Sequence, residues 1–451
     1  MVEYSFEGNV PNSQILEFYS KNRVDCFVMP SQYEGLPVSI MEAEGAGIPI
    51  VATDVGGIKE MIDGNGVLLS ANPSAENMAD AILSVVKKSG EESKQMRDRS
   101  LEIWNNKFDA SRNAQKFVKH LKEKYAGKIK NLILVTEGYP YTDNEKSFLE
   151  TELKELAKSF NITIVARLTG ELNQDKLSNA QNNIGYLTGS SNKESIKFIC
   201  YEEKWNTFYS LAYIIKYFFD LGISKEKGEI IKSNAKIGIR LWESIKYYGK
   251  ALTFRKWIIK NHLLFENDFT DTMFYTYWNL QPTLGLCFAK KKHPDIKLIT
   301  RAHGYDYQDE QWEKSNRKPF MKTIDRNVDE IVFVSETGME YHLAKHGSEN
   351  IEKCLVSYLG SRPTPKRVNG IGTHENETVD QKKNILIVSC ASLIPLKRVK
   401  MIIDSLKVLS TRLEGERIKW IHFGDGPLMN ELKDYAHQNL GIGNGDGQAP
   451  Y

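Results

Sequence analysis

The residues best suited to chemistry are Glu34 and Glu42, which are separated by seven positions. The apolar residues 24–30 predict a buried strand before Glu34, and Pro37 suits the first position of a helix that would carry Glu42. In open α/β sheets, ligands bind beyond the carboxyl ends of the strands, and the free N–H groups at a helix start suit a phosphate. Carboxylates beside such a site can accept hydrogen bonds from sugar hydroxyls. Taken alone, two such glutamates are more often solvated surface residues, so the surrounding sequence decides the interpretation.

Strand and helix signals alternate on both sides of this pair. The predicted strands are 24–30, 48–53, 131–136, 162–165, 272–277, 297–301, 330–334 and 384–389. Helices are predicted at 37–44, 58–62 and 147–159, and a last helix ends near residue 440. Strands that alternate with helices predict βαβ units and parallel sheets. The polar, asparagine-rich residues 170–195 predict a loop.

The composition narrows the class of protein. The chain has 451 residues, which suggests two or three domains, and 60 basic against 58 acidic residues give a net charge of +2. Because basic and acidic residues are almost equal in number, a dedicated nucleic-acid-binding protein is not expected. The five cysteines are far apart and include no C-x-x-C pair, so neither a zinc cluster nor a disulfide framework is expected. The sequence predicts no signal peptide and no membrane span, which favours a cytoplasmic location.

The residues around the two glutamates form a longer pattern. Ser31 precedes Glu34, and the strand start Gly47-Ile48-Pro49 and the turn Val55-Gly56-Gly57 follow Glu42. This run resembles the retaining glycosyltransferases of family 4, which have the GT-B fold. The resemblance implies that Glu42 binds the ribose hydroxyls of a nucleotide-sugar donor, and that Glu34 is catalytic and contacts the transferred sugar. It also implies that the donor site includes Gly35, Leu36 and Pro37. The backbone N–H groups of Gly35 and Leu36 would hold the sugar or the diphosphate.

Residues 389–399 resemble the strand and loop with which the family neutralises the donor diphosphate. Lys397 falls on the family's diphosphate lysine, whereas Ser392 stands where an arginine is usual. Arg398 replaces the usual glycine and is a candidate to compensate. Without this context, Lys397 would be interpreted as a solvated lysine at a helix start. Two further segments match the donor site of the family. Gly424 falls in a turn near the nucleotide, and Phe6 and Glu7 fall in a loop beside the nucleobase.

Candidates for the opposite side of the reaction follow strands of the second pattern. His303 comes directly after the strand 297–301, and the resemblance implies that it faces the donor sugar and is catalytic. Gly138, Tyr139 and Asp306 are candidates for the acceptor side. Each has a structural alternative. A lone histidine is usually structural, an aspartate after glycine is common in turns, and a glycine after a strand often forms a tight turn.

Residues 196–265 are rich in aromatic side chains and locally basic. They contain 13 lysines and arginines against 6 acidic residues, a local charge of +7 (13 − 6). The pattern predicts aromatic-rich helices that suit an anionic membrane surface. The alternative is an ordinary helical layer whose aromatic side chains fill the core and whose lysines are solvated.

The matching pieces stand in a different order from the family, in which the half resembling 128–362 comes first and the glutamate pair last. The sequence therefore predicts a circularly permuted α/β protein of the GT-B class, with two Rossmann-like doubly wound domains facing a cleft. Strand 4–6 is expected to join one parallel sheet with 385–387 and 420–422, and 364–383 is predicted to be a linker. The expected parts are the C-terminal portion of the donor-nucleotide-binding domain (1–108), a crossing helix and junction (109–127), the acceptor-side domain (128–372) and the first portion of the donor domain (373–451).

The resemblance implies a retaining glycosyltransferase that moves a sugar from a UDP- or GDP-sugar to a glycan or lipid-linked acceptor in surface polysaccharide biosynthesis. No cofactor or metal is expected, because helix N-termini, Lys397 and Arg398 can offset the diphosphate charge. A nucleic-acid partner is not expected. Peripheral contact with the inner face of an anionic membrane is expected. Two alternatives stay open: an inactive sugar-nucleotide-binding or scaffolding protein, and a fusion of fragments of two tandem glycosyltransferases.

Overall fold

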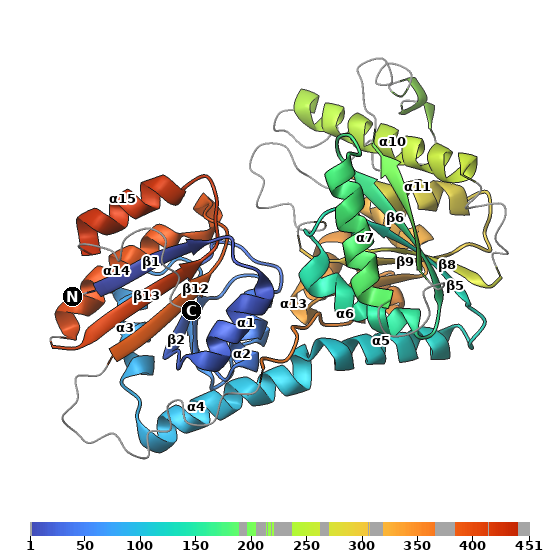
Figure 1. Ribbon diagram of the computed structural model, residues 1–451. Helices are drawn as coiled ribbons and strands as arrows, with labels where there is room; N and C mark the ends of the chain where they lie inside the picture. Colours follow the sequence, from blue (N-terminus) through green and yellow to red (C-terminus); the bar gives the residue numbers. More distant parts are fainter. Residues whose placement is uncertain are drawn as a thin grey trace. The chain divides into compact units, whose positions relative to one another are not determined.

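The chain folds into two α/β units. The computed structural model describes residues 2–188, 196–203, 213, 215–217, 219–220, 237–261, 270–304, 306, 319–365, 384–413 and 415–440. Unit 1 consists of Met1–Asp109 and Leu359–Tyr451, and unit 2 of Ala110–Tyr358. Each unit has a parallel sheet with helices on both faces, which confirms the predicted class of two Rossmann-like doubly wound domains (Figure 1). Among the described helices, none is long and apolar enough to cross a membrane.

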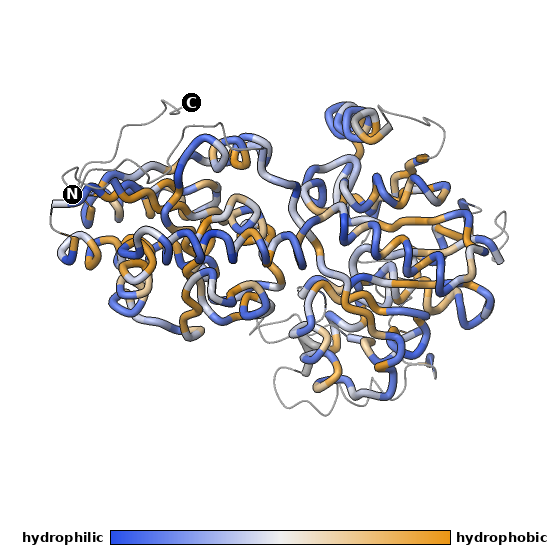
Figure 2. Tube along the Cα trace, turned by 90° about the horizontal axis from the view of Figure 1, so that it is seen from below, coloured by the Kyte–Doolittle hydropathy of each residue, from blue (hydrophilic) through white to orange (hydrophobic). Residues whose placement is uncertain are grey.

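Unit 1 contains a six-stranded parallel sheet in the order β1-β13-β12-β2-β3-β4. Its strands are β1 (Val2–Gly8), β2 (Cys26–Met29), β3 (Ile50–Thr53), β4 (Gly66–Leu69), β12 (Asn384–Cys390) and β13 (Arg417–Phe423). Strands β2 and β3 are buried along their whole length because helices cover both of their faces. Figure 2 colours the chain by hydropathy, with hydrophobic residues in orange. Tyr4 of β1 pairs with Trp420 of β13, so the expected place of strand 4–6 in this sheet is confirmed.

The order of these strands follows the Rossmann pattern when they are counted from β12. Taking β12 and β13 as the first two strands, and β1 to β4 as the next four, gives the spatial order 3-2-1-4-5-6. The order reverses between β12 and β2. Ligands of such sheets bind at this switch point, outside the carboxyl ends of the strands. The residues that follow Met29 and Cys390 therefore occupy the place where a ligand is expected.

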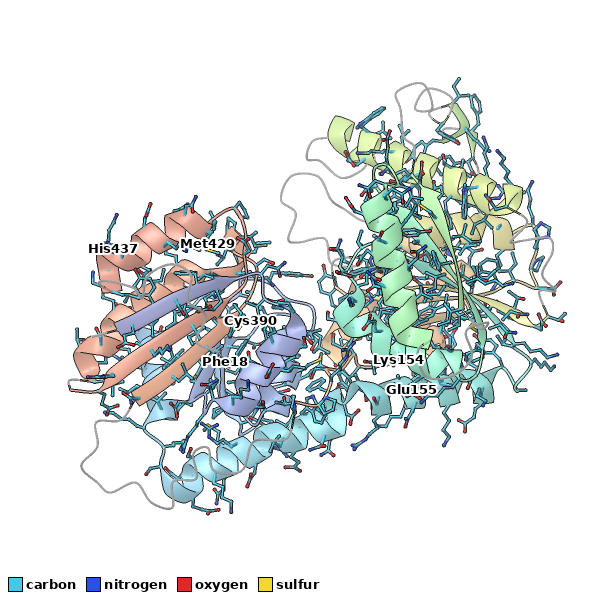
Figure 3. The ribbon with its side chains drawn as sticks, in the orientation of Figure 1. Phe18, Lys154, Glu155, Cys390, Met429 and His437 are labelled. Carbon is cyan, nitrogen blue, oxygen red and sulfur yellow. The ribbon has the colours of Figure 1, made fainter. Side chains whose placement is uncertain are left out.

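Helices cover both faces of the unit 1 sheet. One hydrophobic core joins the sheet to α3 (Ala75–Val86), α14 (Val399–Arg412) and α15 (Met429–Leu440). Helix α1 (Asn12–Lys21) carries Phe18, which is labelled in Figure 3, and packs on the other face. The ring of Phe18 lies 5.3 Å from that of Phe423, centroid to centroid. Helix α2 (Val38–Gly45) follows β2, and its Gly45 lets it approach Trp104, because a Cβ there would come within 3.0 Å of the indole nitrogen. The helix predicted at 58–62 is a short 3₁₀ turn, Ile58–Glu60, and α4 spans Gly90–Ile103.

Unit 2 contains a seven-stranded parallel sheet in the order β11-β10-β9-β8-β5-β6-β7. Its strands are β5 (Asn131–Thr136), β6 (Asn161–Leu168), β7 (Ile196–Glu202), β8 (Thr272–Thr276), β9 (Lys297–Ala302), β10 (Glu330–Phe333) and β11 (Cys354–Val356). Counted from β5, the spatial order begins 3-2-1-4, so the switch point of this sheet lies between β5 and β8. The residues after Thr136 and after Thr276 are the ones placed at it.

Alternating side chains of the unit 2 strands feed two cores, one on each face. Leu132 and Leu134 pack with α5 (Ala110–Lys124) and α6 (Lys146–Ala157). Ile133 and Val135 pack with the opposite layer, formed by α10 (Ile237–Lys260), α11 (Gln281–Lys290) and α12 (Met321–Asn327). Helix α13 spans Glu336–His346. Two residues of α5, His120 and Lys124, contact the buried carboxylate of Glu330, which ties this helix to unit 2.

Three local predictions are wrong. The loop predicted at 170–195 contains α7 (Gln174–Thr188), whose Leu177 and Ala180 pack against Tyr141 and Leu168. Residues 196–202 were expected in a helix and form the edge strand β7. Glu7 was expected in a loop after strand 4–6 and belongs to β1. Most of the predicted linker 364–383 and the glycine-rich tail 441–451 lie outside the described residues.

Candidate functional site

The switch point of unit 1 brings together two residues that are 363 positions apart. Lys397 Nζ donates a hydrogen bond of 2.5 Å to Glu34 Oε1, and Ser31 Oγ donates one of 2.7 Å to the same oxygen. The loops that carry them are joined by the backbone, since Gln32 N donates to Leu396 O at 2.8 Å. The side chain of Glu34 is 10% exposed and that of Lys397 22% exposed. A partly dehydrated cation and carboxylate thus lie where the sheet topology expects a ligand.

The turn after β3 fixes the loop of Glu34 from the other side. Thr53 Oγ1 donates to Ser31 O at 2.5 Å, and Gly57 N donates to Gly35 O at 2.7 Å. Gly56 has a φ of +57°, and a Cβ there would lie 2.0 Å from Glu34 O. Only glycine allows this approach and this backbone conformation without displacing the loop. The Val55-Gly56-Gly57 turn noted in the sequence is therefore a support for the Glu34 loop.

Glu42 lies in the middle of α2 and is buried. Its carboxylate accepts a hydrogen bond from Asn12 Nδ2 at the start of α1. Burial raises the pKa of Glu42 to about 7, and the hydrogen bond from Asn12 lowers it. Burial, together with the charge of Glu42, also raises the pKa of the neighbouring Cys390 thiol to about 12. At neutral pH, Glu42 is thus a carboxyl group near the midpoint of its titration, and Asn12 holds one of its oxygens in place.

The start of α2 lies beside Glu34. Pro37 occupies the N-cap position with extended backbone, and no side chain caps the helix. The first N–H groups of a helix have no partner within it, and together with the helix dipole they favour a bound anion. Leu36 and Pro37 are buried, whereas Gly35 is partly exposed. The uncapped helix start and Lys397 are therefore two sources of positive potential near one carboxylate.

The other expected donor residues have different surroundings. The guanidinium of Arg398 donates to Ala71 O at 2.8 Å and to Asn72 Oδ1 at 2.5 Å, so it is already engaged by the loop after β4. Ser392 is exposed. Gly424 has a φ of +138°, and a Cβ there would lie 1.9 Å from Ala391 O. Phe6 packs edge-on against Trp420 with ring centroids 5.2 Å apart, and Glu7 is the next residue of the same strand.

In unit 2, His303 follows β9 and its ring is held by the backbone. Its Nε2 lies 2.8 Å from Tyr277 O, and because a carbonyl can only accept, Nε2 must carry the proton. Desolvation and the nearby Arg301 lower the pKa of His303 to about 3. The imidazole is therefore neutral at physiological pH and has Nδ1 available as an acceptor. It is placed to accept a hydrogen bond rather than to transfer a proton.

The acceptor-side candidates shape the backbone around His303 and β5. Asp306 is fully buried, and its carboxylate accepts hydrogen bonds from His303 N at 2.7 Å and Asn279 N at 2.9 Å. Gly138 has a φ of +141°, and a Cβ there would lie 2.4 Å from Thr142 Oγ1. Tyr139 is buried, and its N–H donates to Glu145 at 3.0 Å. These three residues hold two loops in place at the carboxyl end of the sheet.

Sequence reasoning missed one residue of the unit 1 site and several in unit 2. Asn12 contacts Glu42 from 30 positions away, and the sequence signals only that Pro11 and Asn12 begin a helix. In unit 2, Arg167 at the end of β6 and Trp278 after β8 converge on the residues that follow β5. Their strands were predicted, so strand-end position was the signal that could have found them.

Comparison with known proteins identifies part of the chain. Residues 3–102 match the family Glycosyl transferases group 1. Over 75 residues the chain is 37% identical to a putative teichuronic acid biosynthesis glycosyltransferase of Bacillus subtilis, and over 64 residues it is 45% identical to an O-antigen biosynthesis glycosyltransferase of Escherichia coli. These stretches cover 17% and 14% of this chain, and 19% and 18% of those relatives. The two-unit Rossmann-like architecture is consistent with the GT-B fold of such enzymes. The segment that carries Glu34 and Glu42 is thus a glycosyl transferases group 1 segment.

Proposed function

We propose that this protein is a retaining glycosyltransferase of family 4, with its donor site at the switch point of unit 1. The single observation that carries the proposal is the contact of Lys397 with Glu34 beside the uncapped start of α2. A donor diphosphate at the helix start would take Lys397 as its counter-ion. Glu42 and Asn12 would hold the ribose hydroxyls, and Glu34 would lie at the transferred sugar. All of these groups belong to one chain and one unit, which favours a complete donor site over a fusion of unrelated fragments.

The chemistry follows from where charge develops. As the bond between the anomeric carbon and the diphosphate breaks, negative charge grows on the leaving phosphate and positive charge on the sugar ring. The start of α2 and Lys397 stabilise the first, and the carboxylate of Glu34 stabilises the second. The leaving phosphate oxygen can take the proton of the acceptor hydroxyl, so the proposal needs no side-chain base and no metal. Neutral His303 fits a role as a hydrogen-bond acceptor for the sugar.

The donor is proposed to be a UDP- or GDP-sugar and the acceptor a glycan or lipid-linked glycan. Support for a surface polysaccharide product comes from the relatives, which are described as teichuronic acid and O-antigen biosynthesis glycosyltransferases. The inactive-protein alternative rests on Ser392, which stands exposed where the family has an arginine. An enzyme would release nucleoside diphosphate from the correct nucleotide-sugar, whereas a binding protein would hold it intact.

The decisive experiment compares ligands in wild type and in Lys397→Ala. UDP- and GDP-sugars are first screened by thermal shift, since a ligand of the native state raises apparent stability. Lys397→Ala is then expected to weaken nucleoside diphosphate about tenfold to a hundredfold, as for loss of a charged hydrogen bond, and to leave the nucleoside nearly unaffected. Lys94→Ala, an exposed lysine of α4, is the matched control. An equal loss for nucleoside and nucleoside diphosphate would assign Lys397 a structural role.

Membrane contact by 196–265 stays a prediction, and residues 204–212, 221–236 and 262–265 of this region lie outside the described residues. In its described part, Phe219 is 80% exposed and Trp242 41% exposed. Other aromatic residues, among them Tyr217 and Tyr248, fill the core as in the alternative interpretation. Sedimentation with anionic and neutral vesicles tests the proposal, and salt-sensitive binding to anionic vesicles alone is the expected result.

A further inference from the structure

Unit 2 has a pocket at the switch point of its own sheet. It has a volume of about 290 Å³, at the lower end of the range for small-molecule sites. Its lining comes from the residues after β5, the end of β6 and the residues after β8: Glu137, Asn144, Glu145, Arg167, Trp278, Leu280 and Gln281. This is the edge at which a doubly wound sheet binds its ligand. The size suits one small polar molecule or one residue of a longer chain.

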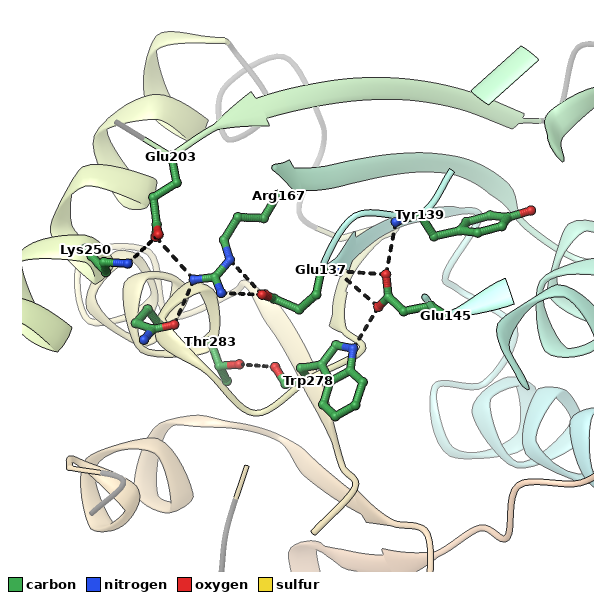
Figure 4. Close-up of polar contacts among 9 residues, drawn as sticks. Glu137, Tyr139, Glu145, Arg167, Glu203, Lys250, Trp278 and Thr283 are labelled. Carbon is green, nitrogen blue, oxygen red and sulfur yellow. Dashed lines mark hydrogen bonds and ion pairs between the residues drawn. The ribbon is translucent and has the colours of Figure 1, made fainter. Parts of the chain in front are cut away.

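The wall of the pocket is a closed network of charged groups (Figure 4). Arg167 donates through Nε and Nη2 to Glu137 Oε2, and through Nη1 to Glu203 at 3.2 Å and Gln281 at 2.8 Å. Lys250 donates to the other oxygen of Glu203 at 2.5 Å. Two carboxylates, Glu137 and Glu203, thus pair with two cations, and Glu145 adds a third carboxylate that accepts from backbone N–H groups and from Trp278. The network leaves no excess positive charge in the wall.

This network indicates which charge a ligand of the pocket can carry. A guanidinium has five N–H donors, and Arg167 uses four of them within the wall, so it cannot grip a phosphate or carboxylate with two parallel hydrogen bonds. An anion would also meet the carboxylates of Glu137 and Glu145. Carboxylate and amide oxygens at the surface of the pocket instead suit ligands that donate hydrogen bonds, as hydroxyl groups do.

Among the described residues of unit 2, two buried polar atoms of interest have no hydrogen-bond partner. The hydroxyl of Tyr247 is one, although the side chain is only 6% exposed and lies close enough to Arg167 and Glu137 for their charges to act on it. Asn279 Oδ1, between the lining residues Trp278 and Leu280, is the other. Buried polar atoms are normally hydrogen-bonded, so these two atoms are unmet hydrogen-bonding groups in the interior of unit 2, and neither belongs to the lining of the pocket.

Trp278 gives the pocket an aromatic wall with a fixed orientation. Its Nε1 donates to Glu145 Oε1 at 2.7 Å, and that carboxylate also accepts from the N–H groups of Glu137 and Tyr139. The indole lies 4.3 Å from the ring of His303, centroid to centroid. An apolar ring surface beside a few fixed polar groups is the usual lining of a site for a compact organic ligand. A sugar ring presents this combination of C–H surface and hydroxyls.

We propose that this pocket binds one uncharged sugar residue of the acceptor, with the Trp278 ring against its C–H surface and Glu137 and Gln281 on its hydroxyls. The assignment rests on the proposed glycosyltransferase function and adds a substrate class to it. It excludes a uronic acid or a phosphate group from this position. Arg167 acts here as a positioning residue, because it holds Glu137 and Gln281 in place for the ligand.

The test uses the full chain without donor. Saturation-transfer NMR is run with the methyl glycosides of glucose, galactose, mannose and N-acetylglucosamine, and with methyl glucuronide and glucose 1-phosphate as anionic probes. At least one neutral glycoside is expected to bind, and neither anionic probe. Gln281→Ala is expected to weaken that binding about threefold to tenfold, as for loss of a neutral hydrogen bond. Glu137→Gln is expected to weaken it as well, because the pair with Arg167 is lost. Gln115→Ala, an exposed glutamine on α5, is the matched control and should leave binding unchanged.

The outcomes separate this proposal from the proposed function. Thermal shift with UDP and GDP reports on unit 1, and Gln281→Ala should leave it unchanged. If no neutral glycoside binds, if an anionic probe binds more tightly, or if Gln281→Ala and Glu137→Gln bind like wild type, the pocket is not this sugar site, whatever the donor does. If glycosides bind as expected but no nucleotide-sugar is turned over, the sugar site is supported and the proposed transferase function is contradicted.

Discussion

The two glutamates that mark this sequence lie in different environments. Glu34 accepts hydrogen bonds from Lys397 and Ser31, so its charge is balanced within the protein. Within the described part of the chain, Glu42 accepts a hydrogen bond from the neutral amide of Asn12 alone, and burial raises its pKa to about 7. Ionising this buried carboxyl group costs free energy, so Glu42 does not stabilise the fold. Its ionised form could accept hydrogen bonds from two ribose hydroxyls, so ligand binding explains it better.

Glu42→Gln tests this view through stability. The pKa of Glu42 is about 7 in the folded chain against 4.5 as its ordinary value, so the folded state binds the proton more tightly. The free energy of unfolding therefore falls as pH rises from 4.5 to 7, and the full cost is present above pH 7. Glutamine mimics the protonated form. We expect Glu42→Gln without ligand to be more stable than wild type at pH 8, by up to about 3 kcal/mol, and about equal at pH 4.5.

The same variant should bind nucleotide more weakly, because the ionised acceptor is gone. Urea unfolding at pH 4.5 and pH 8, with UDP and GDP titrations alongside, measures both effects. The exposed Glu91→Gln on α4 is the control for loss of one charge. A Glu42→Gln protein that is less stable than wild type at pH 8, or that binds nucleotide equally well, would show that Glu42 is a structural residue.

The sequence predicts residues better where chemistry and position coincide. Glu34 and Lys397 were both predicted in loops that follow strands, and their contact follows once those strands are neighbours in the sheet. Asn12 could not be predicted as the partner of Glu42, because the contact depends on how α1 packs beside α2. Arg398 shows the limit of matching by position, since its side chain turns to Ala71 and Asn72, which the sequence alone does not bring near it.

At the scale of elements, the loop of Glu34 depends on the turn after β3. Gly56→Ala would place a Cβ 2.0 Å from Glu34 O in a backbone conformation that alanine rarely adopts. We expect a lower urea midpoint together with weaker binding of UDP or GDP, because the loop must move. Gly64→Ala is a close control. Its φ is +76°, but its Cβ would meet only Arg99 Cγ at 3.7 Å, so it carries the conformational cost of about 1–2 kcal/mol without the clash.

The comparison isolates the contact with the Glu34 loop. Gly56→Ala should be clearly less stable than Gly64→Ala, and only Gly56→Ala should lose nucleotide affinity. Equal stability and equal affinity in the two variants would mean that the turn does not support the site.

Element predictions succeeded where the hydrophobic pattern was continuous and failed where it was sparse. The buried strands β2, β3, β5 and β12 are nearly unbroken apolar runs, which a parallel sheet requires. Helix α7 was missed because few apolar residues, such as Leu177 and Ala180, mark its inner face among many asparagines. Strand β7 was missed because an edge strand needs less apolar surface, and its aromatic residues resemble those of the following helices.

At the scale of the whole molecule, the order of segments is the unusual feature. The Rossmann order of unit 1 appears only when 384–440 is placed before 2–109. We propose that this reflects a circular permutation relative to glycosyl transferases group 1 proteins, whose family model matches residues 3–102. The fold tolerates it because the entropy of joining distant segments grows only with the logarithm of their separation, by about 0.6 kcal/mol per doubling. Burial of β1 against β13, where Phe6 meets Trp420, can offset a cost of this size.

The arrangement predicts that β1 and β13 pair within one chain, and a disulfide tests it. Glu3 and Lys419 are partners in the parallel register and are both partly exposed. Adjacent strands lie about 4.8 Å apart, within the Cα separation that a disulfide accepts. Oxidised Glu3→Cys/Lys419→Cys should therefore run as a single chain on a non-reducing gel, and cross-linking should raise the thermal midpoint relative to the reduced form. The two single variants control for the five natural cysteines. A covalent dimer that forms only in the double variant would mean that the strands pair between two chains, and that each donor site is shared between them.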